Sequence, residues 1–240
     1  MTPGPRALFQ QFSEQISSDN TLSDELAAWA HARNQWQTNW TSRTGSAPEV
    51  VLRLLIPNPT SASQDRWVHP VADQAPELDS WTKRWDRVER GADGKALAAV
   101  FVRTIAEVES NAACAPDACA DLARAASEHG VPLAAFTPAL SSLYPSRFVV
   151  LCDAWLRVLG HYEGAELPKD ISAYPKNNAI ALRWLAAAEG DLLAPVFAGC
   201  PLADRFGVFS RWVVRTHPGS MSGTRFAVSE TQYKEWPPMW

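Results

Sequence analysis

The stretch "TPALSSLYPSRFVVLCDAWLRVLGHYEG", Thr137 to Gly164, contains the residues that decide the fold. A threonine hydroxyl can cap a helix, and proline favours the first helical position. Thr137-Pro138 therefore predicts the start of a helix. The residue before a proline is driven out of the helical region, so Tyr144-Pro145 predicts where that helix ends.

The second half of the stretch predicts a return to the core and a second helix. The apolar residues 148–151 follow the turn at Ser146-Arg147, so we expect them to be buried. Asp153 is a residue type that caps helices, and Gly160 one that ends them. The whole stretch is thus predicted to be a helix–corner–helix unit whose purpose is packing.

Helical periodicity recurs along much of the remaining chain. The segment 50–56 fits a strand or a buried helix, and so does 201–216, in which residues 208–214 satisfy both periods. In the polar tail from Gly219, residues 226–228 are the only candidate strand. The fold class predicted is mainly α, an irregular multi-helix bundle with at most a minor β element. Helices are predicted at 23–41 with Ser23 as its cap, 78–90, 95–109, 117–130 with Gly130 as a left-handed cap, and 176–190 ending at Gly190.

Four prolines among mostly polar neighbours mark residues 57–77 as a loop or domain boundary. We therefore predict an N-terminal helical segment at 1–56 and a main helical domain at 78–240. The apolar ending "EWPPMW" predicts either a cut or a buried tail at Trp240.

Composition and charge are those of an ordinary globular protein. Of 240 residues, 46% are hydrophobic and 20% charged, and the net charge of −4 disfavours a protein that coats nucleic acid or an anionic membrane. No apolar run approaches the ~20 residues that a membrane span needs. The first residues do not resemble a secretory signal, and four cysteines in so long a chain do not suggest a disulfide scaffold. The predicted location is cytoplasmic, without membrane contact.

The eleven tryptophans are interpreted as core residues. Trp29, Trp36 and Trp40 recur with Leu22 and Leu26 at steps that place them on one face of a helix. Aromatic residues in such a stripe more often pack against other helices than stack on nucleic-acid bases.

Motifs that would define a catalytic, cofactor or metal site are absent from the sequence. "GADGK" at 91–95 lacks the glycine spacing and the hydroxyl residue of a phosphate-binding loop. Cys114, Cys119 and His129 are too few for structural zinc and are interpreted as ordinary helix residues. "GSMSG" at 219–223 places methionine where a nucleophile elbow needs serine. We predict no catalytic residue, no cofactor and no metal.

A charge asymmetry near the carboxyl end predicts the binding residues. Between Leu193 and Val228 the only acid is Asp204, whereas four arginines alternate with aromatic residues. Such a pattern suits contact with phosphate groups. The residues predicted to bind nucleic acid are Arg205, Arg211, Arg215 and Arg225; a contact with a partner protein, or plain surface, remains an alternative.

The corner also resembles the region upstream of the motor domain in McrB-like restriction proteins. The resemblance is carried by Leu143, Pro145, Arg147, Phe148 and the Leu159-Gly160 ending, within residues of about 78–190. The GTP-binding motor of those proteins is absent here. The resemblance implies an accessory or target-recognition part of a bacterial defence system.

Three functions follow as hypotheses. The first is a non-catalytic module that binds DNA or a partner subunit in a restriction-like defence system. The second is a small enzyme whose site gathers polar groups around the corner, namely Tyr144, Cys152, Asp153 and His161. The third is a structural or inhibitory protein that acts through surface contact.

Overall fold

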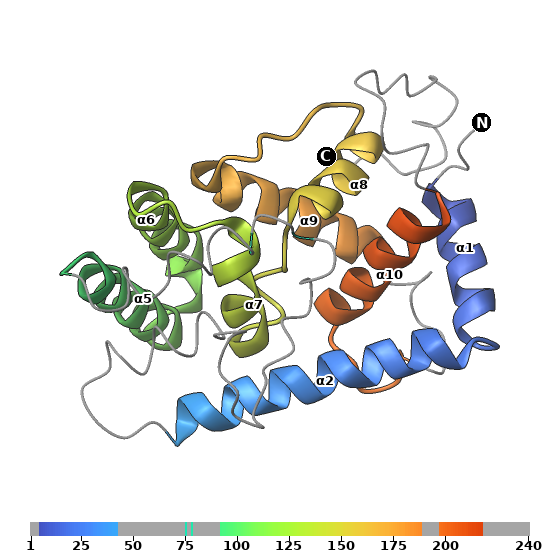
Figure 1. The fold of residues 1–240 in the computed structure, drawn as a ribbon, viewed down its shortest axis with the longest axis horizontal. Coiled ribbons are helices and arrows are strands. Elements are labelled where there is room, and N and C mark those ends of the chain that lie inside the picture. Colours follow the sequence, from blue (N-terminus) through green and yellow to red (C-terminus); the bar gives the residue numbers. More distant parts are fainter. Residues whose placement is uncertain (1–4, 43–74, 76–77, 79–91, 189–196, 218–240) are drawn as a thin grey trace.

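The computed structural model describes residues 5–42, 75, 78, 92–188 and 197–217 (Figure 1). These residues form eight α-helices, and no β-strand occurs among them. The prediction of a mainly α multi-helix fold is therefore confirmed. No helix within these ranges is long and apolar enough to cross a membrane.

Helix α10 (Leu202–Thr216) lies at the centre of the packing. The helices α1 (Pro5–Ile16), α2 (Asn20–Thr41), α8 (Asp153–Glu163) and α9 (Tyr174–Ala188) contact it from different sides (Figure 1). Residues 203–210 of α10 are all buried. This part of the helix is therefore covered on every side, although Asp204, Arg205 and Ser210 within it are polar.

Aromatic rings join the amino-terminal helix to the central one. Phe9 of α1 stacks on Phe209 of α10 with ring centroids 4.2 Å apart, and Phe12 meets the same ring edge-on at 5.4 Å. The indole of Trp212 donates a hydrogen bond of 2.6 Å to the side chain of Gln15. Helices about 200 positions apart in the sequence thus share one core.

Helix α2 runs along one edge of the molecule (Figure 1). Its predicted tryptophan stripe is confirmed, because Trp29, Trp36 and Trp40 are all buried. Its predicted cap is wrong. The helix begins at Asn20 and is capped by the carboxylate of Asp19, which accepts a 2.8 Å hydrogen bond from Thr21 N; the earlier acid therefore takes the role expected of Ser23.

Helices α5 (Ala92–Ser110) and α6 (Ala115–Glu128) form a hairpin at the other end of the molecule (Figure 1). The Thr104 hydroxyl bridges them, lying 3.0 Å from Val100 O and 3.3 Å from Ala118 O. Gly130 follows α6 with φ of +62°, as predicted for a left-handed cap.

Helix α7 (Leu133–Leu143) corrects the predicted start of the corner. It begins four residues before Thr137, its amino-terminal cap is Pro132, and Pro138 lies inside it. Pro138 is the sixth residue of the helix and lies beyond the first turn, so its ring removes the N–H that would otherwise donate to Ala134 O. The predicted end at Tyr144 is confirmed.

Helix α8 corrects two further predictions. Cys152, not Asp153, is the capping residue, and it makes no side-chain cap; the Asp153 carboxylate pairs instead with Lys169 Nζ at 2.9 Å. The helix passes through Gly160 and ends at Gly164, where φ is +67°. Gly160 is required for packing, because a Cβ there would lie 2.6 Å from Ala165 O.

Several predicted elements lie outside the described residues. They are the segment 50–56, most of the boundary 57–77, all but the first residue of the helix 78–90, Gly190, the strand 226–228 and the carboxyl-terminal Trp240. The predicted division into two parts at 57–77 stays a prediction.

Candidate functional site

The corner after α7 is a buried extended segment held by side chains. Phe148 to Cys152 are all at most 3% exposed. Val149 N donates to Asn178 Oδ1 at 2.9 Å, and Val149 O accepts from the Tyr174 hydroxyl at 2.8 Å. A buried backbone group without a partner is costly, so these side chains replace the neighbouring strand that the segment lacks.

Two further contacts complete this arrangement. Leu151 N donates to the Thr137 hydroxyl at 3.1 Å, and Asn178 Nδ2 donates to Arg147 O at 2.9 Å. The hydroxyl of Thr137 also lies 2.8 Å from Leu133 O, within its own helix. Thr137 therefore anchors the extended segment to α7, and Asn178 anchors it to α9.

Of the four polar residues of the enzyme hypothesis, Asp153 and Tyr144 have contacts that the structure describes. Cys152 is fully buried, Asp153 is paired with Lys169, and the Tyr144 ring packs edge-on against Phe148 at 6.3 Å. Burial lowers the pKa of His161 below its usual value. A small pocket among the described residues contains none of the four.

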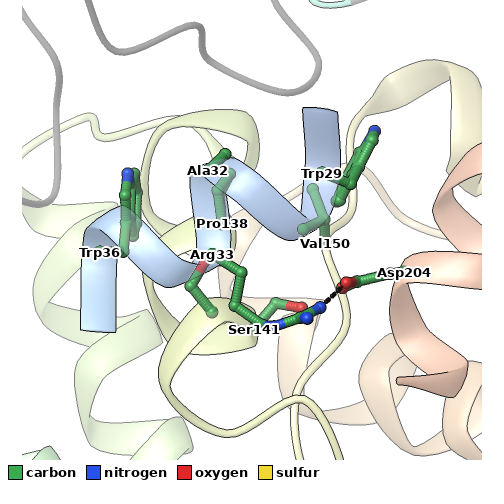
Figure 2. Close-up of a pocket in the computed structure, with 9 residues that line it drawn as sticks. Trp29, Ala32, Arg33, Trp36, Pro138, Ser141, Val150 and Asp204 are labelled. Atoms are coloured by element: carbon green, nitrogen blue, oxygen red, sulfur yellow. Dashed lines mark ion pairs between the residues drawn. The ribbon is translucent and has the colours of Figure 1, made fainter. Parts of the chain in front are cut away.

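That pocket lies between α2, α7 and α10 (Figure 2). Its volume of about 10 Å³ accommodates one water molecule and is far smaller than the several hundred Å³ of a typical ligand pocket. Arg33 and Asp204 form an ion pair across it, with 12% and 4% of their side chains exposed. Burial lowers the pKa of Arg33. The residues lining the pocket are Trp29, Ala32, Arg33, Trp36, Pro138, Ser141, Ser142, Val150 and Asp204.

The arginines predicted to bind nucleic acid are engaged inside the molecule or lie outside the described ranges. Arg205 is 8% exposed, and its guanidinium donates to Cys200 O at 3.0 Å and to Phe197 O at 2.6 Å. Arg215 is exposed and pairs with Glu25 of α2. Arg225 is not among the described residues.

Arg211 lies half-buried on the face of α10 that is directed at α2. Asp204, Arg211 and Arg215 are seven and then four positions apart, so they share one side of the helix, as predicted for the last two. Asp204 and Arg215 each pair with a residue of α2. The predicted binding face is therefore largely an interface between two helices of the same chain.

The ion pair between Arg33 and Asp204 was not anticipated from the sequence. One signal was present, because Asp204 is the single acid in a segment with four arginines. Its partner, however, is 171 positions away, and nothing local identifies it. A buried carboxylate in an apolar helix needs a cation, but the sequence does not say which one.

The outer face of α2 carries no Asp, Glu, Lys or Arg side chain after Leu26. Between Leu26 and Ser42 the only Asp, Glu, Lys or Arg is Arg33, which is paired inward with Asp204. The exposed side chains of this face, which we call the outer α2 face, are Ala27, Ala28, His31, Asn34, Gln35, Thr38, Asn39 and Thr41.

Comparisons with known proteins return no relative from which a site could be assigned. No family model, curated protein or solved structure matches the chain. Among the described residues, no group of three or more histidine, cysteine, aspartate or glutamate side chains is placed to hold a metal ion.

Proposed function

We propose that the chain is a non-catalytic module that binds a partner protein, and that the outer α2 face is its binding surface. The observation that carries the proposal is the absence of charge along this face. The cores of protein interfaces are depleted in charged residues relative to the remaining surface. The eight exposed residues of the outer α2 face span about four helical turns and include no Asp, Glu, Lys or Arg.

The engagement of the arginines favours a protein partner over nucleic acid. Arg205 donates to two carbonyl groups, and Arg215 is neutralised by Glu25. Phosphate recognition needs side-chain cations that are available to neutralise phosphates and so displace the counterions of the nucleic acid. Every described tryptophan is buried, so none is placed to stack on a base.

Membership of a restriction-like defence system remains part of the proposal. Its support is the resemblance around Leu143, Pro145 and the Leu159-Gly160 ending. In such an assembly this chain would be an accessory subunit without chemistry of its own, held to its partner by α2.

Photo-crosslinking in the cells that make the protein tests the proposal. A photoreactive phenylalanine analogue replaces Gln35 at the middle of the outer α2 face. The same analogue at Arg124, an exposed position of α6, serves as the matched control. We expect a discrete protein adduct from position 35 and none from position 124, with mass spectrometry identifying the captured chain.

Two outcomes contradict the proposal. Absence of any adduct at position 35, together with a native circular-dichroism spectrum, shows that the outer α2 face is not a binding surface. An adduct that nuclease treatment removes shows that the ligand is nucleic acid, and the binding of a labelled oligonucleotide should then fall steeply with salt.

A further inference from the structure

The ion pair between Arg33 and Asp204 carries more hydrogen-bonding capacity than one contact uses. A guanidinium has several N–H donors, and a carboxylate accepts several hydrogen bonds through its two oxygens. Among the described residues, Asp204 is the single partner of the Arg33 side chain, and Arg33 is that of the Asp204 carboxylate. A buried ion pair repays its desolvation only when further hydrogen bonds satisfy the remaining donors and acceptors.

The small pocket between α2, α7 and α10 lies directly beside these two groups (Figure 2). Ser141 of α7 lines the same pocket and is 3% exposed, so it contributes a buried hydroxyl. Most of the other lining side chains are apolar, and the indole rings of Trp29 and Trp36 are the largest of them. The pocket therefore gathers a cation, an anion and a hydroxyl from three helices within an apolar surrounding.

The volume of the pocket selects its ligand. A cavity of at least about 10–15 Å³ can hold one water molecule, which then needs about two to four polar partners. The pocket has a volume of about 10 Å³ and is lined by the polar side chains of Arg33, Asp204 and Ser141. It therefore has room for one water molecule and for no organic ligand.

We infer that the pocket is a binding site for one ordered water molecule. The water donates to the Asp204 carboxylate, accepts from the Arg33 guanidinium and makes its third hydrogen bond with the Ser141 hydroxyl. Three hydrogen bonds are about the usual number for a buried water.

The water completes the connection among three helices. The direct contacts join them in pairs, since Gln37 Nε2 of α2 donates to Ser142 O of α7 at 2.8 Å, and Arg33 of α2 pairs with Asp204 of α10. The water adds a polar link between α7 and α10. It thus satisfies a buried ion pair and fixes the point at which the three helices meet.

A crystal structure of the full chain, at a resolution that shows ordered water, tests the inference directly. We expect a density peak within hydrogen-bonding distance of Arg33, Asp204 and Ser141. Magnetic relaxation dispersion of the water nuclei counts long-lived bound waters in solution. Ser141→Val removes the hydroxyl and fills the pocket, so it should lose one such water. Ser127→Val, on the exposed side of α6, should lose none.

Ser141→Ala adds no atom and serves where the larger valine prevents folding. It removes one of the three partners, so the residence time of the water should become about fivefold shorter. Absence of density in the pocket, in crystals that show other ordered waters, overturns the inference. So does an unchanged number of long-lived waters in Ser141→Val, or an unchanged residence time in Ser141→Ala, in variants with a native circular-dichroism spectrum.

Discussion

The indole rings of Trp29 and Trp155 stack with their centroids 5.6 Å apart, and Gly207 is the residue of α10 that leaves room for both. A Cβ at Gly207 would lie 3.0 Å from Trp155 Cη2 and 3.2 Å from Trp29 Cη2. The central helix, α2 and α8 therefore meet at a position where only hydrogen fits without displacement of a buried ring.

Gly207→Ala should destabilise the protein by about 1–3 kcal/mol in urea unfolding, because the added methyl overpacks a closed core. The intrinsic helix preference for alanine, about 1 kcal/mol, acts in the opposite direction and is outweighed. Gly160→Ala should cost more than Gly207→Ala, since its Cβ would meet a backbone oxygen at 2.6 Å, which cannot rotate away. A stabilised Gly207→Ala variant contradicts this description of the contact.

Thr137→Val tests the anchoring of the extended segment at the corner. Valine preserves the shape of threonine but leaves Leu151 N buried without its 3.1 Å acceptor. We expect a loss of about 1–3 kcal/mol in the free energy of unfolding. The control is Thr41→Val at the exposed end of α2, which should change stability by no more than about 0.5 kcal/mol. Equal effects at the two positions would remove the structural role assigned to Thr137.

The ion pair between Arg33 and Asp204 should show a strongly non-additive double-mutant cycle. Either Arg33→Met or Asp204→Leu alone leaves an uncompensated charge beside the small pocket and should cost about 3–5 kcal/mol. The double variant should recover much of this loss, because no buried charge then remains.

The exposed pair of Arg124 and Asp121, 3.1 Å apart on α6, provides the comparison for this cycle. Its removal should cost at most about 1 kcal/mol, since solvent screens both groups. Additive effects of Arg33→Met and Asp204→Leu in chemical denaturation would show that the two residues are not coupled in solution.

Alkaline pH should destabilise the fold through Cys119. Burial raises the pKa of this thiol from 9.0 to about 12, so the unfolded chain releases the proton at lower pH than the native protein does. The contribution of the protonated Cys119 thiol to the free energy of unfolding is fully present below pH 9 and is lost as the pH rises towards 12. In that window the wild type should lose about 1.4 kcal/mol per pH unit more than Cys119→Ala. Parallel curves of unfolding free energy against pH would contradict the assignment.

The helices and their buried faces were predictable because periodicity is a local property of the sequence. Leu97, Phe101, Ile105 and Val108 recur at helical steps and are buried in α5 as expected. The same reasoning placed Trp29 in the core. Errors concentrated at helix boundaries, where several nearby residues can serve as the cap.

The corner shows why local reasoning fails for polar residues with distant partners. Thr137 and Pro138 form a plausible helix start by sequence, yet the hydroxyl of Thr137 is used by Leu151, fourteen positions away. Gly160 was interpreted as a stop signal, although the structure uses its missing side chain for close packing. In each case the deciding contact exists only after the chain has folded.

The arginines near the carboxyl end show the same limit for a site. Their alternation with aromatic residues is typical of a nucleic-acid surface and equally of a central helix whose charges pair with its neighbours. The structure favours the central helix, because Arg215 pairs with Glu25. Arg205 likewise donates to the carbonyl groups of Phe197 and Cys200. The lack of charge on one side of α2 is visible in the sequence. That this side is exposed is known only from the packing of α2 against α10.

The location of the central helix late in the chain has a consequence during synthesis. Phe9 and Phe12 are synthesised about 200 residues before Phe209 and Trp212, whose rings pack against them. Translation at 5–20 residues per second leaves these two phenylalanines waiting on the order of ten seconds or longer. Until the last described helix has been made, these two rings lack their partners on α10, and apolar surface exposed in this way is prone to aggregation.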